Sequence, residues 1–249
     1  MSLYLNLRPE MSHDPNTYIR DIVIPVFQGQ WTENSFEYES SIGTAFLIGN
    51  RGFAITAAHV IDQIGSDIGK AAVGFIGDDN QWIPIRIIDT EIHDLEDVGI
   101  IKLEKCPIAS WLVSSDKHEN QSCTYDSWGY PIAIAELSKK YEEHQLESPD
   151  LIYTHGYVRR RISKQLPVSI FRGSAFYELS EVAGEGCSGS PVIARTSIGK
   201  PFWEVFGIYI GTANAGFEAS YAVRSDAIFN WHPKIINRTL REESSDGNV

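Results

Sequence analysis

The decisive stretch of the chain is Gly184-Glu185-Gly186-Cys187-Ser188-Gly189-Ser190-Pro191. It places one serine, Ser188, among glycines, which adopt backbone conformations that other residues avoid. Such a loop can turn two N–H groups toward one point, where they stabilise the negative oxygen of a tetrahedral intermediate. Gly186 and Ser188 are the expected donors. A serine hydroxyl attacks well only when a base removes its proton, so a histidine and a carboxylate are expected elsewhere in the chain.

The histidine is found in residues 56–59, Thr-Ala-Ala-His, which follow an apolar segment typical of a strand. A neutral imidazole at His59 would take the proton of Ser188 and return it to the leaving group. The plain structural interpretation is that His59 is a core or surface histidine and Ser188 a turn serine in a glycine-rich loop. The occurrence of both with a matching carboxylate favours the catalytic interpretation.

The carboxylate is found in residues 97–101, Asp-Val-Gly-Ile-Ile. The apolar run after Asp97 indicates a buried strand, and the residue at its start is suited to hold the imidazole of His59 in the required tautomer. Asp94 and Glu96 lie close by. They are interpreted as solvated loop charges or as substitutes for Asp97.

The order histidine, aspartate, serine distinguishes this set from two other triads. Subtilisins have the order Asp, His, Ser, and α/β-hydrolases have Ser, Asp, His. The nucleophile motif of α/β-hydrolases, G-x-S-x-G, also fails here, because Ser190 stands where its last glycine would be.

The chain resembles the trypsin-like (chymotrypsin-fold) serine peptidases of bacterial type over about residues 41–230. The resemblance rests on residues 43–48 (Gly-Thr-Ala-Phe-Leu-Ile), 56–59, 97–101 and 186–191. It implies an all-β fold of two six-stranded antiparallel β-barrels, with the site between them and a C-terminal helix. It also implies that His59 is the general base, Asp97 its orienting carboxylate and Ser188 the nucleophile.

Cys187 departs from the pattern of secreted trypsins. Those enzymes have an aspartate immediately before the serine, where it pairs with a newly cut N-terminus. Activation by N-terminal trimming through that ion pair is therefore not expected. The thiol is interpreted as a small buried filler or as a redox-sensitive group beside the nucleophile.

The resemblance also implies a substrate pocket. In trypsin an aspartate six residues before the serine binds Lys or Arg; the corresponding residue is Val182. With Tyr209, Ile210 and Gly211 on the wall strand, an uncharged pocket for a small or medium P1 residue is expected.

Short segments rich in Ile, Val, Phe and Tyr predict two series of strands, without the strand–helix alternation of a parallel sheet. The first series comprises residues 42–48, 53–56, 71–76, 83–88 and 98–103. The second comprises residues 122–128, 151–158, 167–179, 191–195, 202–210 and 220–223. Helices are expected at 57–64, 132–145 and 226–241, and a frayed tail at 242–249.

These elements predict three parts. Residues 1–20 form an N-terminal segment, and 21–110 form the first barrel, which carries His59 and Asp97. Residues 111–249 form a linker, the second barrel with Ser188, and the C-terminal helix with its tail. The candidate linker between the two barrels is residues 104–121.

Composition excludes several classes of protein. The chain has 249 residues, 43% of them hydrophobic, and a net charge of −12. It can therefore bury a large core, while its acidic balance argues against nucleic acid as a partner. No apolar run is long enough to span a membrane, and no signal peptide is recognised, so a cytoplasmic location is expected.

No metal or cofactor is expected. The three cysteines, Cys106, Cys123 and Cys187, fit neither a disulfide framework nor a zinc ribbon. Five other histidines lack metal-ligand spacing and are interpreted as structural or surface residues: His93, His118, His144, His155 and His232.

The resulting hypothesis is a cytoplasmic bacterial serine endopeptidase that cleaves protein or peptide substrates through an acyl-enzyme. Control by a regulatory protein partner or by narrow specificity is expected, because a cytosolic protease is a hazard to its host. Two alternatives remain: a catalytically silent pseudopeptidase that serves as a protein-binding module, and an esterase that uses the same triad.

Overall fold

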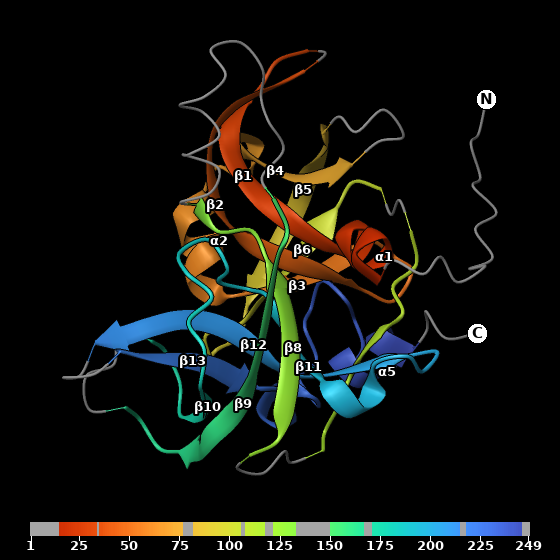
Figure 1. Ribbon diagram of the computed structural model, residues 1–249. Coiled ribbons are helices and arrows are strands. Elements are labelled where there is room, and N and C mark those ends of the chain that lie inside the picture. Colours follow the sequence, from red (N-terminus) through yellow and green to blue (C-terminus); the bar gives the residue numbers. More distant parts are fainter. Residues whose placement is uncertain are drawn as a thin grey trace.

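Two β-barrels dominate the computed structural model, which describes residues 15–33, 35–76, 82–105, 108–117, 122–132, 150–166, 171–214 and 218–245. The barrel of strands β1 to β6 lies above the barrel of strands β8 to β13 in Figure 1. The expected all-β fold with two six-stranded barrels is thereby confirmed.

The first barrel closes in the strand order β1-β2-β3-β6-β5-β4. Its strands are β1 (Val23–Trp31), β2 (Phe36–Ile48), β3 (Phe53–Thr56), β4 (Ala71–Ile76), β5 (Trp82–Ile92) and β6 (Gly99–Leu103). Strand β1 was not among the expected strands, because Pro25 and Gly29 interrupt its pattern. The barrel accommodates these residues with register shifts against β2 at Val26/Phe27 and Gln28/Gly29.

The second barrel has the strand order β11-β8-β9-β10-β13-β12 and is closed by the pairing of β11 with β12. Its strands are β8 (Thr124–Gly129), β9 (Ile152–Ser163), β10 (Ala175–Leu179), β11 (Pro191–Ala194), β12 (Trp203–Asn214) and β13 (Glu218–Arg224). A further strand, β7 (Leu112–Ser114), pairs parallel with β12 and lies within the expected linker region. Strand β10 starts later than the sequence suggested, because residues 171–174 are not in a strand.

Helices are short and lie outside the barrels. They are α1 (Pro15–Ile22), α2 (Ala58–Ile64), the 3₁₀ turns η1 (Ile68–Lys70) and η2 (Arg195–Ser197), α4 (Ser225–Ile228) and α5 (Leu240–Ser245). Helix α2 confirms the helix expected at 57–64, whereas the helix expected at 132–145 falls on residues 133–149, outside the described ranges. Within the part of the chain that the structure describes, no helix has the length and apolar character needed to cross a bilayer.

The C-terminal helix is present but is not continuous over residues 226–241. Helices α4 and α5 are separate, because Pro233 has no N–H to continue a helix and Asn237 adopts a left-handed φ of 59°. Helix α5 begins at a capping box, in which the Glu242 N–H donates to Thr239 Oγ1 and the Thr239 N–H donates to Glu242 Oε2.

The tail expected to fray from residue 242 onward is ordered through Ser245. The reason is Glu243, whose side chain is fully buried and forms ion pairs with Arg51 and Arg238. A buried carboxylate needs such partners, and they hold α5 against the turn that follows β2. The prediction of a frayed tail is therefore wrong for residues 242–245.

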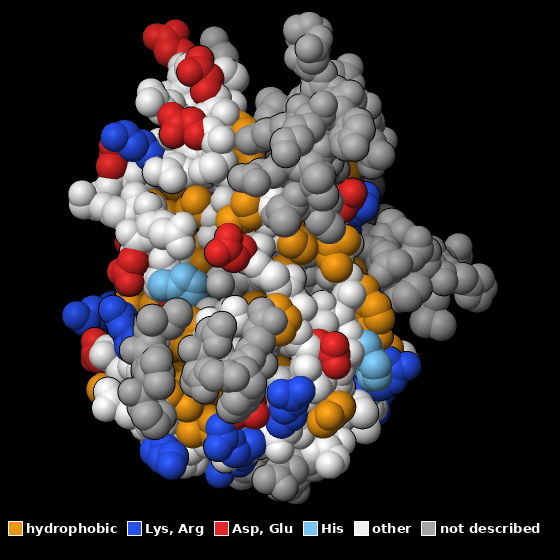
Figure 2. Space-filling model, turned by 60° about the vertical axis from the view of Figure 1, so that its left-hand side comes forward, with side chains coloured by type: hydrophobic (Ala, Val, Ile, Leu, Met, Phe, Trp, Pro, Cys, Tyr) orange, Lys and Arg blue, Asp and Glu red, His pale blue; other side chains and the backbone are white. Residues whose placement is uncertain are grey.

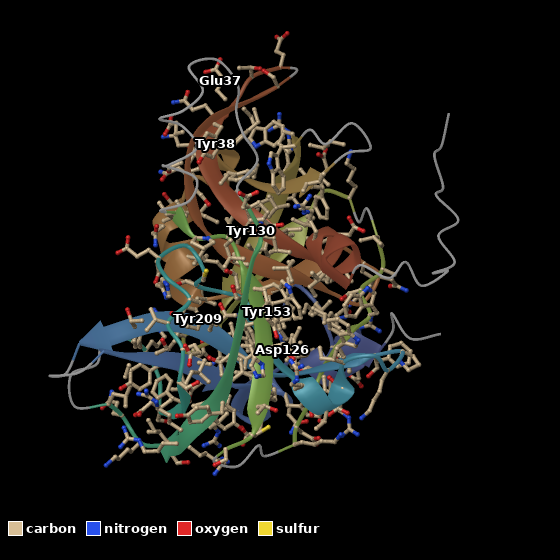
Figure 3. The ribbon with its side chains drawn as sticks, in the orientation of Figure 1. Glu37, Tyr38, Asp126, Tyr130, Tyr153 and Tyr209 are labelled. Carbon is tan, nitrogen blue, oxygen red and sulfur yellow. The ribbon has the colours of Figure 1, made fainter. Side chains whose placement is uncertain are left out.

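Tyr130 joins the two barrels (Figure 3). Its hydroxyl donates to the carbonyl oxygen of Val23 in β1 at 3.0 Å, and its N–H donates to Thr44 Oγ1 in β2 at 3.0 Å. The side chain is fully buried. Because it follows β8 of the second barrel, these bonds fix the two barrels against each other.

Charge is distributed unevenly over the molecule. On the face shown in Figure 2, acidic side chains gather at the end formed by the β1–β2 hairpin, which carries the exposed Glu33, Glu37 and Glu39. Basic side chains gather at the opposite end, where β9 exposes Arg159, Arg160 and Arg161. On this face the acidic cluster and the basic cluster thus lie at opposite ends.

Candidate active site

His59 and Asp97 form a tight pair in the first barrel. His59 is the second residue of α2, and Asp97 lies two residues before β6. The His59 Nδ1 atom is 2.9 Å from Asp97 Oδ2, and the His59 main-chain N–H donates to Asp97 Oδ1 at 3.0 Å. The carboxylate is 4% exposed and the imidazole 35%. With the proton on Nδ1, the ring presents Nε2 as an acceptor.

The loop that carries Asp97 is folded around His93. The Nδ1 atom of His93 accepts the N–H groups of Leu95 at 3.1 Å and Glu96 at 3.0 Å, and its main-chain N–H donates to Val98 O at 2.9 Å. Burial lowers the pKa of His93, although the carboxylates of Glu96 and Asp94 act in the opposite direction. The neutral ring that the loop requires is thus favoured, which agrees with a structural rather than a catalytic role for His93.

The serine loop of the second barrel is docked on β2 of the first through Thr44, which is fully buried. The Thr44 N–H donates to Ser188 O at 2.8 Å, and its hydroxyl donates to Gly186 O at 2.8 Å. Gly189 has a φ of +96°, and a Cβ atom there would lie 1.9 Å from Thr44 O. Only glycine allows this approach, which explains why a glycine follows Ser188 directly.

The histidine helix and the serine loop meet at Gly43 of β2. A Cβ atom at Gly43 would lie 2.7 Å from Val60 Cγ2 and 3.2 Å from Ser188 O. Val60 follows His59 directly, so the side chain next to His59 and the main chain of Ser188 both pack against Gly43. The structure therefore brings the three predicted triad residues to one region between the barrels.

The Ser188 hydroxyl does not point to the histidine. It donates to the carbonyl oxygen of Ile210 at 3.4 Å, and no hydrogen bond joins it to His59 in the described part of the chain. The main-chain N–H groups of Gly186 and Ser188 donate to no carbonyl among the described residues. Gly186 has a φ of +89°, so the loop holds these two N–H groups unused beside the nucleophile.

The four residues expected to line the pocket have different environments. Gly211 lies beside the nucleophile, since a Cβ atom there would be 3.8 Å from Ser188 Oγ. Tyr209 and Ile210 are buried, and the Tyr209 hydroxyl accepts the N–H of Ala183 at 3.3 Å (Figure 3). Val182 is 44% exposed, so it lies at the surface and not at a closed pocket base.

Cys187 is buried beside this pocket wall. Its Sγ donates to the carbonyl oxygen of Ala183 at 3.0 Å, and burial raises the pKa of the thiol to about 12. A thiol of that pKa stays protonated at neutral pH and is a poor nucleophile. These observations agree with the interpretation of Cys187 as a filler.

The sequence did not predict the contacts that two residues near the site make with the other barrel. Thr44 belonged to a segment that carried the resemblance, but its docking function depends on contacts with residues far along the chain. Glu96 was considered a loop charge or a substitute for Asp97. It is buried and bonded to main-chain N–H groups of the second barrel, for which the sequence has no signal.

A second His–Asp pair lies on the outside of the second barrel. His155 Nδ1 is 3.0 Å from Asp126 Oδ1, which also accepts hydrogen bonds from Tyr153 and Arg195. Asp126 and Tyr153 come from neighbouring strands, β8 and β9 (Figure 3). Among the described residues, no group of three His, Cys, Asp or Glu side chains is arranged to hold a metal ion.

Comparison with known proteins identifies the fold. No protein-family model matches the sequence, and no curated protein matches it. Solved structures do match: the apo MamO protease domain from Magnetospirillum magneticum has a TM-score of 0.57 and 14% identity, over 84% of this chain and 95% of that one. The active form of the Rv3671c protease from M. tuberculosis has a TM-score of 0.56 and 17% identity, over 87% and 82%.

The inactive form of the Rv3671c protease matches equally well, with a TM-score of 0.56 and 17% identity over 85% of this chain and 90% of that one. The likeness therefore concerns the fold and does not distinguish an active from an inactive arrangement. The chain has the chymotrypsin fold of bacterial trypsin-like serine protease domains.

Proposed function

We propose that the protein is a serine endopeptidase that hydrolyses peptide bonds through an acyl-enzyme on Ser188. One observation carries this proposal: the His59–Asp97 pair and the Ser188 loop converge on Gly43 from the two barrels. The fold supports the same conclusion, because solved structures that share it are serine protease domains.

In the proposed reaction, the Ser188 hydroxyl turns from Ile210 O to His59 Nε2. The Ser188 oxygen attacks the substrate carbonyl while His59 takes the hydroxyl proton, and Asp97 stabilises the imidazolium. Collapse of the tetrahedral intermediate expels the amine, which receives that proton from His59. Water, activated by the same histidine, then hydrolyses the ester and restores the Ser188 hydroxyl.

The oxyanion formed in both steps would be held by the N–H groups of Gly186 and Ser188. Both are unused by carbonyls of the described chain, and the loop is fixed in place by Thr44. Losing one such donor typically costs about 3 kcal/mol in the transition state. This arrangement needs neither a metal nor a cofactor.

The proposed specificity is for a small or medium uncharged P1 residue. The Tyr209 side chain extends from β12 to the main chain of Ala183, a hydrogen bond of 3.3 Å, and so fills part of the space between them. We propose that Tyr209, Ile210 and Gly211 line the shallow pocket that remains. We assign no substrate contact to the charged Glu181 and Glu185. Val182, which is 44% exposed, would contact the substrate only at the surface of the protein.

A pseudopeptidase that binds protein without cleaving it is the second candidate. It is favoured by the resting position of the Ser188 hydroxyl, which is bonded to Ile210 O. The same observation suits a latent peptidase controlled by a regulatory protein partner. Hydrolysis of short esters without cleavage of any protein would instead favour an esterase.

We place the protein in the cytoplasm. The buried Cys187 is a free thiol, as expected in a reducing compartment. Cell fractionation with an antibody against the chain tests this placement.

The function is tested by labelling the purified protein with a fluorophosphonate probe, which reacts with an activated serine. We expect labelling of the wild type, and none of Ser188→Ala or His59→Ala. Ser190→Ala is the matched control, since the Ser190 hydroxyl is buried without a hydrogen-bond partner among the described residues, and its loss should leave labelling unchanged. A folded wild type that resists labelling with and without candidate partner proteins would support the pseudopeptidase.

A further inference from the structure

Glu96 is a charged residue in a buried position next to the proposed site. It is 5% exposed and directly precedes Asp97. Its Oε2 atom accepts the main-chain N–H groups of Ser174 at 3.1 Å and Ala175 at 3.3 Å, and its Oε1 atom lies 3.5 Å from Ser174 Oγ. No ion pair in the described part of the chain includes Glu96, so main-chain donors offset the cost of burying its charge.

The partners of Glu96 belong to the other barrel. Ala175 is the first residue of β10, and the preceding Gly173 has a φ of +110°. A Cβ atom at Gly173 would lie 2.1 Å from Glu96 Oε2. The segment 173–175 is therefore shaped around the carboxylate, and a side chain at Gly173 would displace it.

Asp97 itself has no such link. Both of its oxygens accept hydrogen bonds from His59, one from the main chain and one from the ring. No hydrogen bond joins Asp97 to the second barrel among the described residues. Glu96 is thus the residue through which the Asp97 loop is hydrogen-bonded to the barrel that carries Ser188.

The same segment also reaches the nucleophile. Phe171 lies three residues before Ser174, and its ring carbons are 3.6 Å from the Cβ position of Gly211. That position is 3.8 Å from Ser188 Oγ. A run of five residues, 171–175, therefore extends from the neighbourhood of the Ser188 hydroxyl to the Glu96 carboxylate.

We propose that Glu96 is a positioning residue for the reaction, which aligns the His59–Asp97 pair with Ser188 by fastening the Asp97 loop to segment 171–175. The inference rests on the proposed peptidase function. The Glu96 side chain is bonded to the second barrel, while its main-chain N–H donates to the His93 ring of the first barrel, so the loop that carries Asp97 is held from both barrels.

The test compares Glu96→Ala and Glu96→Gln with Asp94→Ala, a matched control in which an exposed carboxylate of the same loop is removed. Glutamine keeps an oxygen that accepts the Ser174 N–H, whereas alanine keeps none. We expect the maximal rate of fluorophosphonate acylation to fall about 10- to 100-fold in Glu96→Ala, with less than a threefold change in half-saturating probe concentration. Glu96→Gln should recover most of the rate, and Asp94→Ala should match the wild type.

A second measurement does not depend on activity. The proton between His59 Nδ1 and Asp97 Oδ2 is followed by its low-field ¹H resonance in the folded proteins. We expect the resonance in the wild type, Glu96→Gln and Asp94→Ala, and its broadening or loss in Glu96→Ala. This readout stays valid if the wild type fails to react with the probe, so failure of the proposed function is distinguishable from failure of this inference.

Two results would overturn the proposal. One is a folded Glu96→Ala protein with the wild-type resonance, together with a wild-type acylation rate where the wild type reacts. The other is equal loss in Glu96→Ala and Glu96→Gln in step with a lowered melting temperature, which would mark Glu96 as a purely structural residue.

Discussion

The described part of the chain contains two His–Asp pairs with almost equal N···O distances, and only one of them has the surroundings expected of a catalytic site. His59 Nδ1 lies 2.9 Å from Asp97 Oδ2, and His155 Nδ1 lies 3.0 Å from Asp126 Oδ1. Both carboxylates are buried and both imidazoles are partly exposed. Distance alone therefore does not identify the functional pair.

The partners of the two carboxylates make the difference. Among the described residues, Asp97 accepts hydrogen bonds only from His59, so its charge is available to an imidazolium that forms during a reaction. Asp126 Oδ1 is shared by His155, Tyr153 and Arg195, and the Arg195 guanidinium lies 3.4 Å from His155 Nδ1. The Asp126 carboxylate is therefore bonded to three side chains and is not dedicated to orienting one imidazole. We interpret this second pair as a structural cluster that joins β8 and β9 to η2.

The largest effect that separates the two pairs is expected in catalysis. Asp97→Asn leaves the shape of the site intact but favours the wrong tautomer of His59, so the rate should fall by about 10⁴-fold. Asp126→Asn should change the rate less than threefold. The rate of fluorophosphonate labelling of both variants measures this contrast, and comparable losses in the two variants would contradict it.

The next effect is on stability, where the variant of the second pair should be affected more than the variant of the first pair. Asp126→Ala removes a buried carboxylate that satisfies three donors, so the free energy of unfolding should fall by about 1–3 kcal/mol. His59→Ala, which truncates a partly exposed ring, should have a smaller effect. Urea unfolding of the two variants and the wild type makes the comparison. A more severe loss in His59→Ala would show that the first pair, too, is mainly structural.

A third histidine sharpens the comparison and has the smallest expected effect. In His93 the Nδ1 atom accepts two N–H groups, so the folded state needs the neutral ring, and burial lowers its pKa below 6.5. The unfolded chain therefore binds a proton more readily, and stability should be complete above pH 6.5. It should fall as the pH decreases from 6.5 toward the folded-state pKa, by at most about 1.4 kcal/mol per pH unit.

The matched variant is His93→Asn, whose side-chain oxygen accepts similar bonds but does not titrate. The difference in unfolding free energy between the wild type and this variant should be constant above pH 6.5 and should decrease below it. Subtracting the two curves removes the contributions of groups that both proteins share, including the other histidines. A difference that is independent of pH would show that His93 does not titrate with folding.

Much of the architecture was predictable because it depends on local sequence patterns. Apolar segments bounded by glycine, asparagine and proline marked most strands, and residues 57–64 indicated helix α2. The failures have local reasons as well: Pro25 and Gly29 concealed β1, and Pro233 divided the C-terminal helix. Residues 242–245 looked disordered by composition but are held by the buried ion pairs of Glu243.

For the candidate site, the sequence by itself determined which side chains stand in the order histidine, aspartate, serine and why glycines flank the serine. Those are properties of residue types and of short-range backbone freedom. Only the tertiary structure decided which of two His–Asp pairs is unencumbered, where the Ser188 hydroxyl rests, and that Glu96 is buried against main-chain donors of the other barrel. Such contacts join residues far apart in the chain. Every residue except proline has a main-chain N–H group, so the residue types do not show which of these groups will bond to Glu96.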